Sequence, residues 1–343
     1  MQTNKHILVI RLSAMGDVAM TVPVLRAFSI QHKEVKITIV SRPFFRPFFD
    51  SLENVSFFAV DVKKRHKGFL GLIRLFLDLK KLKITHIADL HNVLRSKVIR
   101  ILFFSIGIKS AATDKGRTDK KALTRAENKI FEPTKSMFER HIETFNKLGF
   151  QIDLTNPKFP EKAILSTVVL SKIEAFSEMN LIGIAPFAQY ESKVYPQDLM
   201  QEVINELSKK HNQKILLFGG GKTEIQKLNQ LQNNNANVIV VAGKLSFSEE
   251  LHLISNLDIM LSMDSGNSHI AAMLGVKVVT LWGATHPYAG FKPFNQPMVN
   301  CLISDRTKYP LLPTSVYGNK IVPGYEDVMR SISVEKVVSS IEN

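Results

Sequence analysis

Residues 258–283, DIMLSMDSGNSHIAAMLGVKVVTLWG, decide the fold class. An apolar run ends at Asp264, a helix rich in small residues opens after Ser265, and a β-branched run follows from Val276. Parallel neighbours in a sheet need a crossover of this kind, because a tight hairpin connects only antiparallel strands. The stretch therefore predicts a βαβ unit with a polar turn at the carboxyl end of its first strand.

The same alternation continues along the rest of the chain. In the first half, four apolar runs are each followed by a helical pattern, and these runs are HILVIR, VKITIV, VSFFAV and ITHIADL. In the second half, the runs before the quoted unit are LIGIAPF, KILLFGGG and NVIVVAG. This rhythm is typical of parallel sheets covered by helices. We predict two doubly wound, Rossmann-like α/β domains facing a cleft, with ligands bound beyond the carboxyl ends of the strands.

Domain boundaries follow from length and from proline. A chain of 343 residues is about twice the size of one domain of roughly 150 residues. The stretch 153–163, DLTNPKFPEKA, has two prolines and no periodicity, so it predicts a linker between a domain over 1–152 and one over 164–343. We also expect a mobile basic loop over 109–125, and a terminal amphipathic helix, ISVEKVVSSIE, that can pack back on the first domain.

Composition narrows the choice of cellular compartment for this protein. Hydrophobic residues make up 45% of the chain and charged residues 22%, which is typical of a globular protein without a membrane span. The opening MQTNKHILVIRLSAMGD lacks the cleavage site of a signal peptide, so we interpret it as the first core strand. The single cysteine, Cys301, excludes an intramolecular disulfide and fits a reducing compartment. We therefore expect a cytoplasmic location.

Positive charge is confined to the first half of the chain. Residues 1–150 contain 28 Lys/Arg and 13 Asp/Glu, whereas the remaining residues contain 17 and 18. This asymmetry indicates a polyanionic partner, either a membrane surface, a phosphorylated lipid or nucleic acid. The alternative is a merely solubilising surface, which explains the high isoelectric point but leaves the neutral second half unexplained.

Two strand-to-helix turns carry candidate chemistry. Arg11-Leu-Ser-Ala-Met-Gly-Asp17 follows the first strand, and its Asp17 either caps the helix or removes a proton from an incoming hydroxyl. In Met263-Asp-Ser-Gly-Asn-Ser-His269, the amides of Ser265, Gly266 and Asn267 form a helix N-terminus suited to a diphosphate. Ordinary capping is the alternative for this turn as well, and His269 either contacts the ligand or orients the loop.

Other motifs are weaker. Lys193, in APFAQYESKVYPQ, can neutralise phosphate charge, although an isolated lysine is usually a solvated surface residue. Gly219-Gly-Gly-Lys-Thr-Glu224 has neither the phosphate-loop spacing nor the dinucleotide fingerprint, so we prefer a glycine turn with Glu224 reaching a ribose. Asp-x-Asp, paired His/Cys ligands and Gly-x-Ser-x-Gly are absent from the sequence, which disfavours metal-centred chemistry and serine hydrolysis.

Three segments taken together resemble the ADP-heptose:lipopolysaccharide heptosyltransferases. These segments are ILVIRLSAMGDVAMTVPVLRAF, SKVYP and MDSGNSHIAAMLGVKVVTLWGATHP, which follow one another in the family's order. The resemblance implies a GT-B glycosyltransferase that is inverting and needs neither metal nor cofactor. It also implies that the acceptor binds the N-terminal domain and that ADP-heptose binds the C-terminal domain.

Site residues are implied position by position. Asp17 matches the family's catalytic base and Lys193 its diphosphate-contacting lysine. The implied donor-binding residues are Lys193, Glu224 at the ribose, Leu245 near adenine, and Asp264, Ser265, Gly266, Asn267 and His269. Ala188, Gln189 and Tyr195 depart from the family's pattern near the donor.

The function implied is transfer of heptose to the lipid A/Kdo inner core of lipopolysaccharide, at the inner face of the cytoplasmic membrane. A polyanionic acceptor matches the basic first half. Candidate acceptor-binding residues are Ser13, Lys63, Lys64, Arg65, Lys67, Lys115, Arg117, Lys120 and Lys121. Three alternatives remain open at this point: a transferase of another nucleotide sugar in cell-envelope glycan synthesis, a non-catalytic basic module that binds membrane or nucleic acid, and a nicotinamide oxidoreductase.

Overall fold

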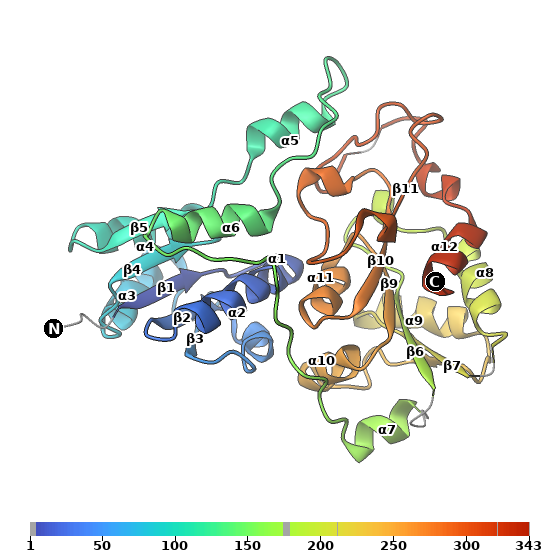
Figure 1. Ribbon diagram of the computed structural model, residues 1–343, viewed down its shortest axis with the longest axis horizontal. Coiled ribbons are helices and arrows are strands. Elements are labelled where there is room, and N and C mark those ends of the chain that lie inside the picture. Colours follow the sequence, from blue (N-terminus) through green and yellow to red (C-terminus); the bar gives the residue numbers. More distant parts are fainter. Residues whose placement is uncertain (1–4, 174–178, 211, 321, 343) are drawn as a thin grey trace. The chain divides into compact units, whose positions relative to one another are not determined.

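A computed structural model describes residues 5–173, 179–210, 212–320 and 322–342, and the chain forms two compact units (Figure 1). The first unit comprises 1–115 and 135–159, and the second comprises 116–134 and 160–343. Each unit is a parallel sheet with helices on both faces, and the predicted pair of Rossmann-like α/β domains is therefore confirmed.

The first unit has a five-stranded parallel sheet in the order β3-β2-β1-β4-β5. Its strands are β1 His6–Ile10, β2 Lys36–Ser41, β3 Val55–Ala59, β4 His86–Asp89 and β5 Lys109–Ala112. Its helices are α1 Met15–Ala19, α2 Thr21–Gln31, η1 Pro43–Phe48, α3 Gly68–Lys80, α4 Leu94–Phe104 and α6 Met137–Asn146. The central strand β1 is buried along its whole length, as its unbroken apolar sequence HILVI predicts.

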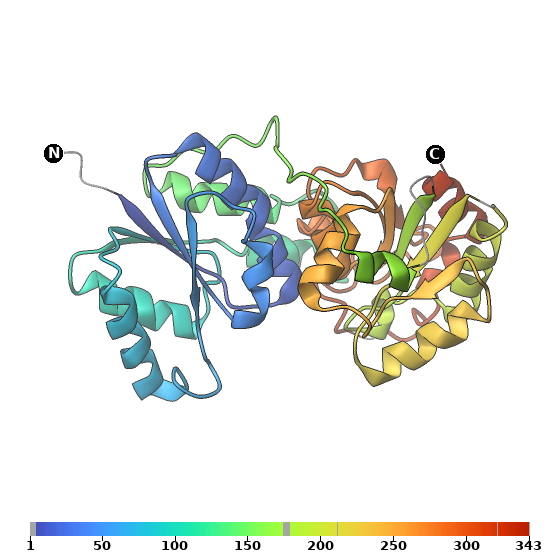
Figure 2. The ribbon, with the colours of Figure 1, turned by 90° about the horizontal axis from the view of Figure 1, so that it is seen from below.

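Two helical layers enclose this sheet. The chain crosses from β1 to β2 through α2, and from β3 to β4 through α3. These two crossovers run in opposite directions along the sheet. Because both crossovers are right-handed, α2 and α3 lie on opposite faces of the sheet. Helices α2 and α6 contact each other on one face, and α3 and α4 contact each other on the other face (Figure 2). The ring centroids of Phe76 and Phe103 lie 4.8 Å apart and join α3 to α4.

The second unit has a six-stranded parallel sheet in the order β11-β10-β9-β6-β7-β8. Its strands are β6 Asn180–Ala185, β7 Gln213–Leu217, β8 Val238–Val240, β9 Ile259–Met263, β10 Lys277–Trp282 and β11 Cys301–Ile303. Its helices are α5 Arg117–Thr124, α7 Thr167–Ile173, η2 Glu191–Lys193, α8 Gln197–Leu207, α9 Gly221–Gln232, α10 Phe247–Ser255, α11 Gly266–Met273, η3 Pro287–Ala289, η4 Met298–Asn300, η5 Val328–Ser331 and α12 Val334–Glu342.

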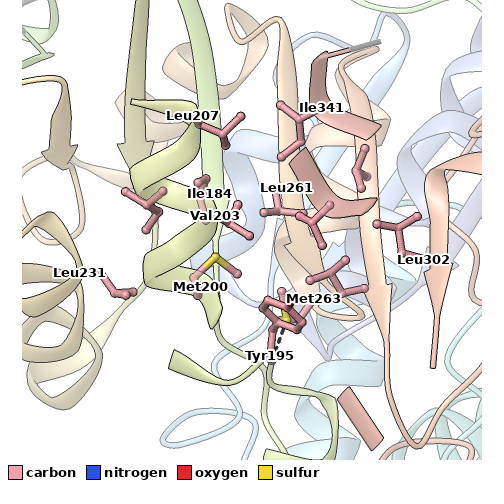
Figure 3. Packing of buried hydrophobic residues seen from close by; sticks show 14 of the residues in the cluster. Ile184, Tyr195, Met200, Val203, Leu207, Leu231, Leu261, Met263, Leu302 and Ile341 are labelled. Atoms are coloured by element: carbon pink, nitrogen blue, oxygen red, sulfur yellow. Dashed lines mark hydrogen bonds between the residues drawn. The ribbon is translucent and has the colours of Figure 1, made fainter. Parts of the chain in front are cut away.

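One apolar cluster joins the strands of the second unit to helices α8, α9 and α12 (Figure 3). Met200, Val203 and Leu207 are the inward residues of α8, and they pack beside Ile184 of β6 and Leu261 of β9. The terminal helix α12 packs against α8 and buries Val337 and Ile341 in this cluster. This helix, predicted to be able to pack back on the first domain, thus contributes to the core of the second unit.

The segment after β5 departs from the sequence prediction. Residues 109–125, predicted to be a mobile loop, contain strand β5 and helix α5. The segment 116–134, predicted to belong to the first domain, is part of the second unit. Its contacts explain the assignment, because the Arg306 guanidinium stacks 3.3 Å from the Phe131 ring centroid and the Thr134 N–H donates to the Tyr288 carbonyl at 2.9 Å.

Three further observations bear on the predicted compartment and charge. Within the described residues, no helix is long and apolar enough to cross a membrane. Cys301 is a buried core residue, and this burial raises the pKa of its thiol to about 11. Divided by the structural units, the chain has 24 Lys/Arg and 11 Asp/Glu in the first and 21 and 20 in the second. The charge asymmetry therefore belongs to the folded units.

Glu250, in the first turn of α10, gives the stability of the second unit a testable pH dependence. Burial raises the pKa of Glu250 to about 7, above its ordinary value of 4.5. The unfolded chain therefore releases this proton first, and the folded state loses stability as pH rises between these values. We expect Glu250→Gln to raise the free energy of unfolding by about 2–3 kcal/mol at pH 8 and to leave it unchanged at pH 4.

The neighbouring Glu249 provides a control of opposite sign for urea unfolding monitored at both pH values. Hydrogen bonds from Ser246 lower the pKa of Glu249, so its charged form stabilises the fold above its ordinary pKa. Glu249→Gln should therefore lower stability at pH 8. Equal stability of Glu250→Gln and the original chain at pH 8 would contradict the prediction.

Candidate active site

Three loops of the second unit bring charged and polar side chains together. Lys193 follows β6, Asp264 follows β9 and Thr285 follows β10, and these strands are neighbours in the sheet. The Lys193 Nζ lies 3.2 Å from Asp264 Oδ2, and the Thr285 hydroxyl donates to the same oxygen at 2.8 Å. Asp264 is 7% exposed, so this carboxylate is held by its partners at the carboxyl edge of the sheet. Thr285 was not predicted from the sequence.

Close backbone packing fixes the loop that carries Lys193. The Ala284 N–H donates to the Ser192 carbonyl at 3.0 Å, and the Ser192 hydroxyl donates to the Gly318 carbonyl at 2.6 Å. A Cβ on Gly283 would lie 2.3 Å from the Ser192 carbonyl oxygen, so glycine is required for this approach. On the other side of the loop, the Tyr195 N–H donates to Met263 Sδ (dashed line in Figure 3).

The first turn of α11 has free donors to offer. Ser265 is the N-cap residue, yet its side chain makes no cap hydrogen bond and lies 3.1 Å from the Ser262 hydroxyl instead. Ordinary side-chain capping, the alternative considered for this motif, is therefore absent at Ser265. The amides of Gly266 and Asn267 lie in the first turn of the helix, where backbone N–H groups have no intrahelical acceptor. With Lys193 beside this turn, the arrangement favours an anion.

The other predicted donor residues lie at adjoining strand ends. Glu224 follows β7, and its Oε2 accepts the Gly220 N–H at 2.7 Å, so this carboxylate holds the glycine turn that opens α9. Leu245 is half-buried in the turn between β8 and α10. His269 is buried within α11. The ligand contacts predicted for these three side chains stay predictions.

Tyr195, one of the three departures from the family's pattern, is a core residue. Its side chain is 1% exposed, and its hydroxyl donates to the Ile332 carbonyl at 2.8 Å. Ala188 packs against the same apolar cluster as a partly buried residue. Tyr195 therefore has a structural role that does not depend on the identity of a sugar.

Asp17 occupies the corresponding strand end in the first unit. It is the third residue of α1, and its Oδ2 accepts the Ala14 N–H at 3.1 Å. The same oxygen lies 2.6 Å from the guanidinium of Arg11, which is itself buried and donates to the Leu90 carbonyl. About a third of the Asp17 side chain is exposed, so the carboxylate is held in place but reachable from solvent. Arg11 was quoted in the motif, but its pairing with Asp17 was not predicted.

Cations surround this edge of the first sheet. Burial, and next the charge of Arg11, lower the pKa of His91 to about 4, and Lys115 and Arg42 act in the same direction. His91 is therefore neutral near pH 7, and positive charge lies close to it. Arg11, Arg42, His91 and Lys115 follow β1, β2, β4 and β5, so this edge can hold an anionic ligand. Arg42 and His91 were missed because neither stands in a recognisable motif.

The predicted acceptor-binding residues fall into two groups. The first group, which belongs to the first unit, comprises Ser13, Lys63, Lys64, Arg65, Lys67 and Lys115. The Asp61 carboxylate accepts the backbone N–H groups of Lys63 and Lys64, whose side chains are exposed. Arg65 forms a two-pronged ion pair with Asp78, so its charge is already matched within the unit.

The second group lies on the segment 116–134. Arg117, Lys120 and Lys121 belong to α5 in the second unit, not to the first domain as predicted. The Lys120 ammonium lies 4.0 Å from the Phe291 ring centroid, and Lys120 is 4% exposed. As a buried cation stacked on an aromatic ring, Lys120 anchors this segment. Lys120 is therefore not a solvated surface charge, and its predicted contact with the acceptor stays a prediction.

A separate cavity of about 400 Å³ lies in the second unit. It is lined by parts of the segments 186–200, 314–320 and 322–330, together with Lys227, Leu231 and Ala284. None of the donor residues predicted from the sequence contributes to this lining, although Ser192 and Val194, on either side of Lys193, do. Within the described ranges, no group of three or more His, Cys, Asp or Glu side chains has an arrangement that could hold a metal ion.

Comparison with known proteins identifies relatives for most of the chain. The model of the family described as "Glycosyltransferase family 9 (heptosyltransferase)" matches residues 72–317. Lipopolysaccharide heptosyltransferase 1 of Campylobacter coli is 24% identical over 305 residues, covering 82% of this chain and 85% of that protein. The core heptosyltransferase OpsX of Haemophilus influenzae is 24% identical over 296 residues, covering 83% and 81%.

Solved structures share the two-unit fold. The glycosyltransferase family 9 protein of Veillonella parvula has a TM-score of 0.74 at 19% identity, covering 98% of this chain and 96% of that one. E. coli heptosyltransferase WaaC with ADP has a TM-score of 0.68 at 17% identity, covering 98% and 99%. At these identities the likeness establishes the fold alone.

Proposed function

Because the chain belongs to glycosyltransferase family 9, the heptosyltransferase family, we propose that it transfers heptose from ADP-heptose to the lipid A/Kdo inner core of lipopolysaccharide. That it is a glycosyltransferase follows from the family. One observation carries the choice of a sugar diphosphate as donor, namely the Lys193–Asp264–Thr285 cluster beside the uncapped first turn of α11. E. coli heptosyltransferase WaaC, solved once with ADP and once with ADP-2-deoxy-2-fluoro heptose, supports ADP-heptose in particular.

The donor is proposed to bind the second unit through its charged leaving group. The amides of the first turn of α11 and the Lys193 ammonium neutralise the diphosphate, and they stabilise the charge that develops as the glycosidic bond breaks. Asp264 accepts hydrogen bonds from sugar hydroxyls, while Glu224 meets the ribose and Leu245 the adenine. Since the Lys193 ammonium and the helix amides neutralise the diphosphate, the proposal includes no metal and no cofactor.

The transfer is proposed to be a single displacement with inversion. The acceptor oxygen attacks the anomeric carbon from the face opposite the diphosphate, the bond to the diphosphate oxygen breaks, and ADP leaves with the electron pair. Asp17 takes the hydroxyl proton during the attack. Arg11 holds the Asp17 carboxylate at the end of β1 and keeps it oriented toward solvent.

The direct test offers the protein ADP-heptose and a heptose-free lipid A/Kdo acceptor. We expect ADP release matched by an acceptor mass increase of one heptose, and little release from ADP-glucose or UDP-glucose. Efficient transfer from another nucleotide sugar, with ADP-heptose inert, would replace this proposal by the related transferase of cell-envelope glycans. Absence of transfer from every donor would contradict the enzymatic proposal.

The acceptor side is proposed to be electrostatic, at the inner face of the cytoplasmic membrane. The first unit carries 24 Lys/Arg against 11 Asp/Glu, and Arg11, Arg42 and Lys115 lie near His91 at its sheet edge. A phosphorylated, Kdo-bearing lipid is polyanionic and lies in an anionic membrane surface, so both would be attracted to this unit. No nucleic acid is invoked, because the anionic acceptor accounts for the charge.

Salt dependence checks the acceptor proposal. Exposed charges are screened beyond roughly 8–10 Å at physiological ionic strength, so activity on a lipid-linked acceptor should fall steeply between 50 mM and 300 mM NaCl. Lys63→Gln/Lys64→Gln/Lys67→Gln should raise the acceptor KM several-fold and leave ADP affinity unchanged. Arg65 is left intact because Asp78 already pairs with it.

Lys162→Gln/Lys308→Gln/Lys336→Gln is the matched control, since it removes the same charge from exposed positions of the second unit. It should leave the acceptor KM unchanged. Equal KM effects in the two variants, or an enzyme insensitive to salt, would make the charge asymmetry a general surface property.

A further inference from the structure

The outer faces of α3 and α4 carry large apolar side chains that the fold leaves uncovered. The inward residues of these helices, among them Leu72, Leu75, Ile99 and Phe103, belong to the apolar core against the sheet. Many of the outward residues are apolar, whereas on an ordinary surface helix they would be polar. Six of them are each 51–79% exposed, and these are Phe69, Leu70, Leu77, Leu94, Ile101 and Phe104, here called the α3–α4 surface.

Other helices of the protein show that this pattern is local. The exposed residues of α8 are Gln197, Asp198, Glu202, Asn205 and Glu206, all of them polar. Those of α12 are Glu335, Lys336, Ser339 and Glu342, which are polar as well. Within the first unit, α6 exposes Glu139 and Asn146. The short helix α7 also exposes Val168 and Leu170, but the neighbouring helices α3 and α4 together expose six large apolar side chains, and exposed apolar area of this kind marks an interaction site.

Helical spacing mixes the apolar residues with cations. On α3, Leu70, Arg74, Leu77 and Lys81 recur at three- and four-residue intervals and so share one face. On α4, Leu94, Lys97 and Ile101 do the same. The two helices contact each other through Phe76 and Phe103 and lie on the same face of the first sheet (Figure 2).

Charge around the surface is one-sided. Residues 61–109 contain 12 Lys/Arg and 3 Asp/Glu. All three acids are engaged locally, because Asp61 accepts backbone N–H groups, Asp78 pairs with Arg65 and Asp89 lies 3.0 Å from the Arg100 guanidinium. Of the cations on the outward stripes, Lys81 also lies 3.7 Å from Asp78, whereas Arg74 and Lys97 are exposed and form no ion pair with the described acids. This excess of positive charge disfavours a basic protein partner and favours an anionic one.

We propose that the α3–α4 surface is the face by which this protein docks on an anionic lipid bilayer, with Phe69, Leu70, Leu94 and Phe104 entering the boundary between headgroups and acyl chains. A paired apolar and cationic helix face is the composition that binds such a boundary in the plane of the membrane. The inference deepens the proposed function, on which it rests for an acceptor that lies in a membrane, and it names the docking face. Arg74, Lys80 and Lys97 contact lipid phosphates in this arrangement.

Vesicle flotation tests the docking face without any sugar transfer, so its failure is distinguishable from failure of the proposed function. The probes are vesicles of phosphatidylethanolamine and phosphatidylglycerol at 3:1, compared with phosphatidylcholine vesicles. We expect binding to the anionic vesicles to exceed binding to the neutral ones. Phe69→Ser/Leu94→Ser/Phe104→Ser should lower the partition coefficient at least tenfold, while transfer to a soluble, lipid-free acceptor stays within twofold of the original chain.

The matched control is Ile164→Ser/Val168→Ser/Val299→Ser, which removes apolar residues that are 94%, 52% and 76% exposed in the second unit. This variant should bind the vesicles like the original chain. Equal losses in both variants, or no loss in the α3–α4 variant, would overturn the proposal. So would a dimer of the original chain that the α3–α4 variant abolishes in size-exclusion chromatography, because the surface would then be a subunit interface.

Fluorescence gives a second measurement in the folded protein. The chain has a single tryptophan, Trp282, which is 1% exposed in the core of the second unit. Phe104→Trp therefore adds a reporter on the docking face against a constant background. We expect a blue shift and quenching by brominated acyl chains on addition of the anionic vesicles. An unchanged spectrum with vesicles bound would place the contact on another face and overturn the assignment.

Discussion

Replacing Asp17 by Asn is expected to lower turnover by about 10²–10⁴-fold, the contribution typical of a positioned general base. Asn keeps an oxygen that can accept the Ala14 N–H and contact Arg11, so the local structure at the start of α1 should persist. What Asn cannot do is take the acceptor proton. ADP-sugar affinity should be unchanged, since the proposed donor residues belong to the second unit. Steady-state turnover and ADP titration together measure both quantities.

The control for Asp17→Asn is a substitution at another carboxylate that also accepts the N-cap N–H of its helix but is not proposed to act as a base. Glu139 is the third residue of α6 in the same unit, and it accepts the Ser136 N–H at 2.7 Å as Asp17 accepts that of Ala14. Losing a helix cap costs about 1 kcal/mol of stability. Glu139→Gln should therefore remain fully active. Turnover of Asp17→Asn within a few-fold of the original enzyme would reduce Asp17 to a cap and an ion-pair partner.

Replacing Lys193 by Met is expected to weaken ADP binding by about 10–100-fold, because a hydrogen bond to a charged group contributes about 1.5–3 kcal/mol. Turnover should fall as well, since the same ammonium faces the charge that develops on the leaving diphosphate. The substitution also removes the cation that pairs with Asp264. The Thr285 hydroxyl remains as a hydrogen-bond donor to Asp264, but it does not neutralise the negative charge, so the carboxylate repels a diphosphate. Isothermal titration with ADP gives the affinity directly.

A second substitution separates these two contributions of Lys193. In Lys193→Met/Asp264→Asn the unpaired charge is gone, so ADP affinity should partly recover relative to Lys193→Met. Lys214 supplies the control, because it is another buried lysine of the second unit and donates to the Ala236 carbonyl near the start of β7, away from the carboxyl edge. Lys214→Met should lower stability and leave ADP affinity unchanged. Equal ADP affinity of Lys193→Met and the original chain would remove Lys193 from the site.

The sequence by itself determined the two α/β units and the strand ends at which candidate residues lie. Apolar runs of strand length that alternate with helical periods predict parallel sheets, and nine of the strands coincide with such runs. Because parallel strands present their carboxyl ends at one edge, the order of residues alone placed Asp17 after β1, Lys193 after β6 and Asp264 after β9. The missed strands are β5, whose sequence KSAA contains no apolar run, and β11, whose sequence CLI is only three residues long and is flanked by polar residues.

Partners across the fold were decided only by the tertiary structure. Periodicity tells which face of an element is buried, but it does not tell what lies opposite that face. The pairing of Asp17 with Arg11, and of Asp264 with Lys193 and Thr285, depends on how loops fold over the strand ends. The segment 116–134 joined the second unit through Phe131, Lys120 and Thr134, contacts with residues more than 150 positions away in the sequence.

The same distinction holds for the surfaces. Sequence alone determined that positive charge gathers in the first half, because charge is a property of composition. The sequence also predicted a helix after each of the runs VSFFAV and ITHIADL, but an apolar residue in a helix is equally compatible with a core and with an exposed face. The tertiary structure decided which of these apolar residues are exposed, since exposure depends on every neighbour in space. The sheet covers one side of α3 and α4 and leaves Phe69, Leu94 and Phe104 exposed on the other side.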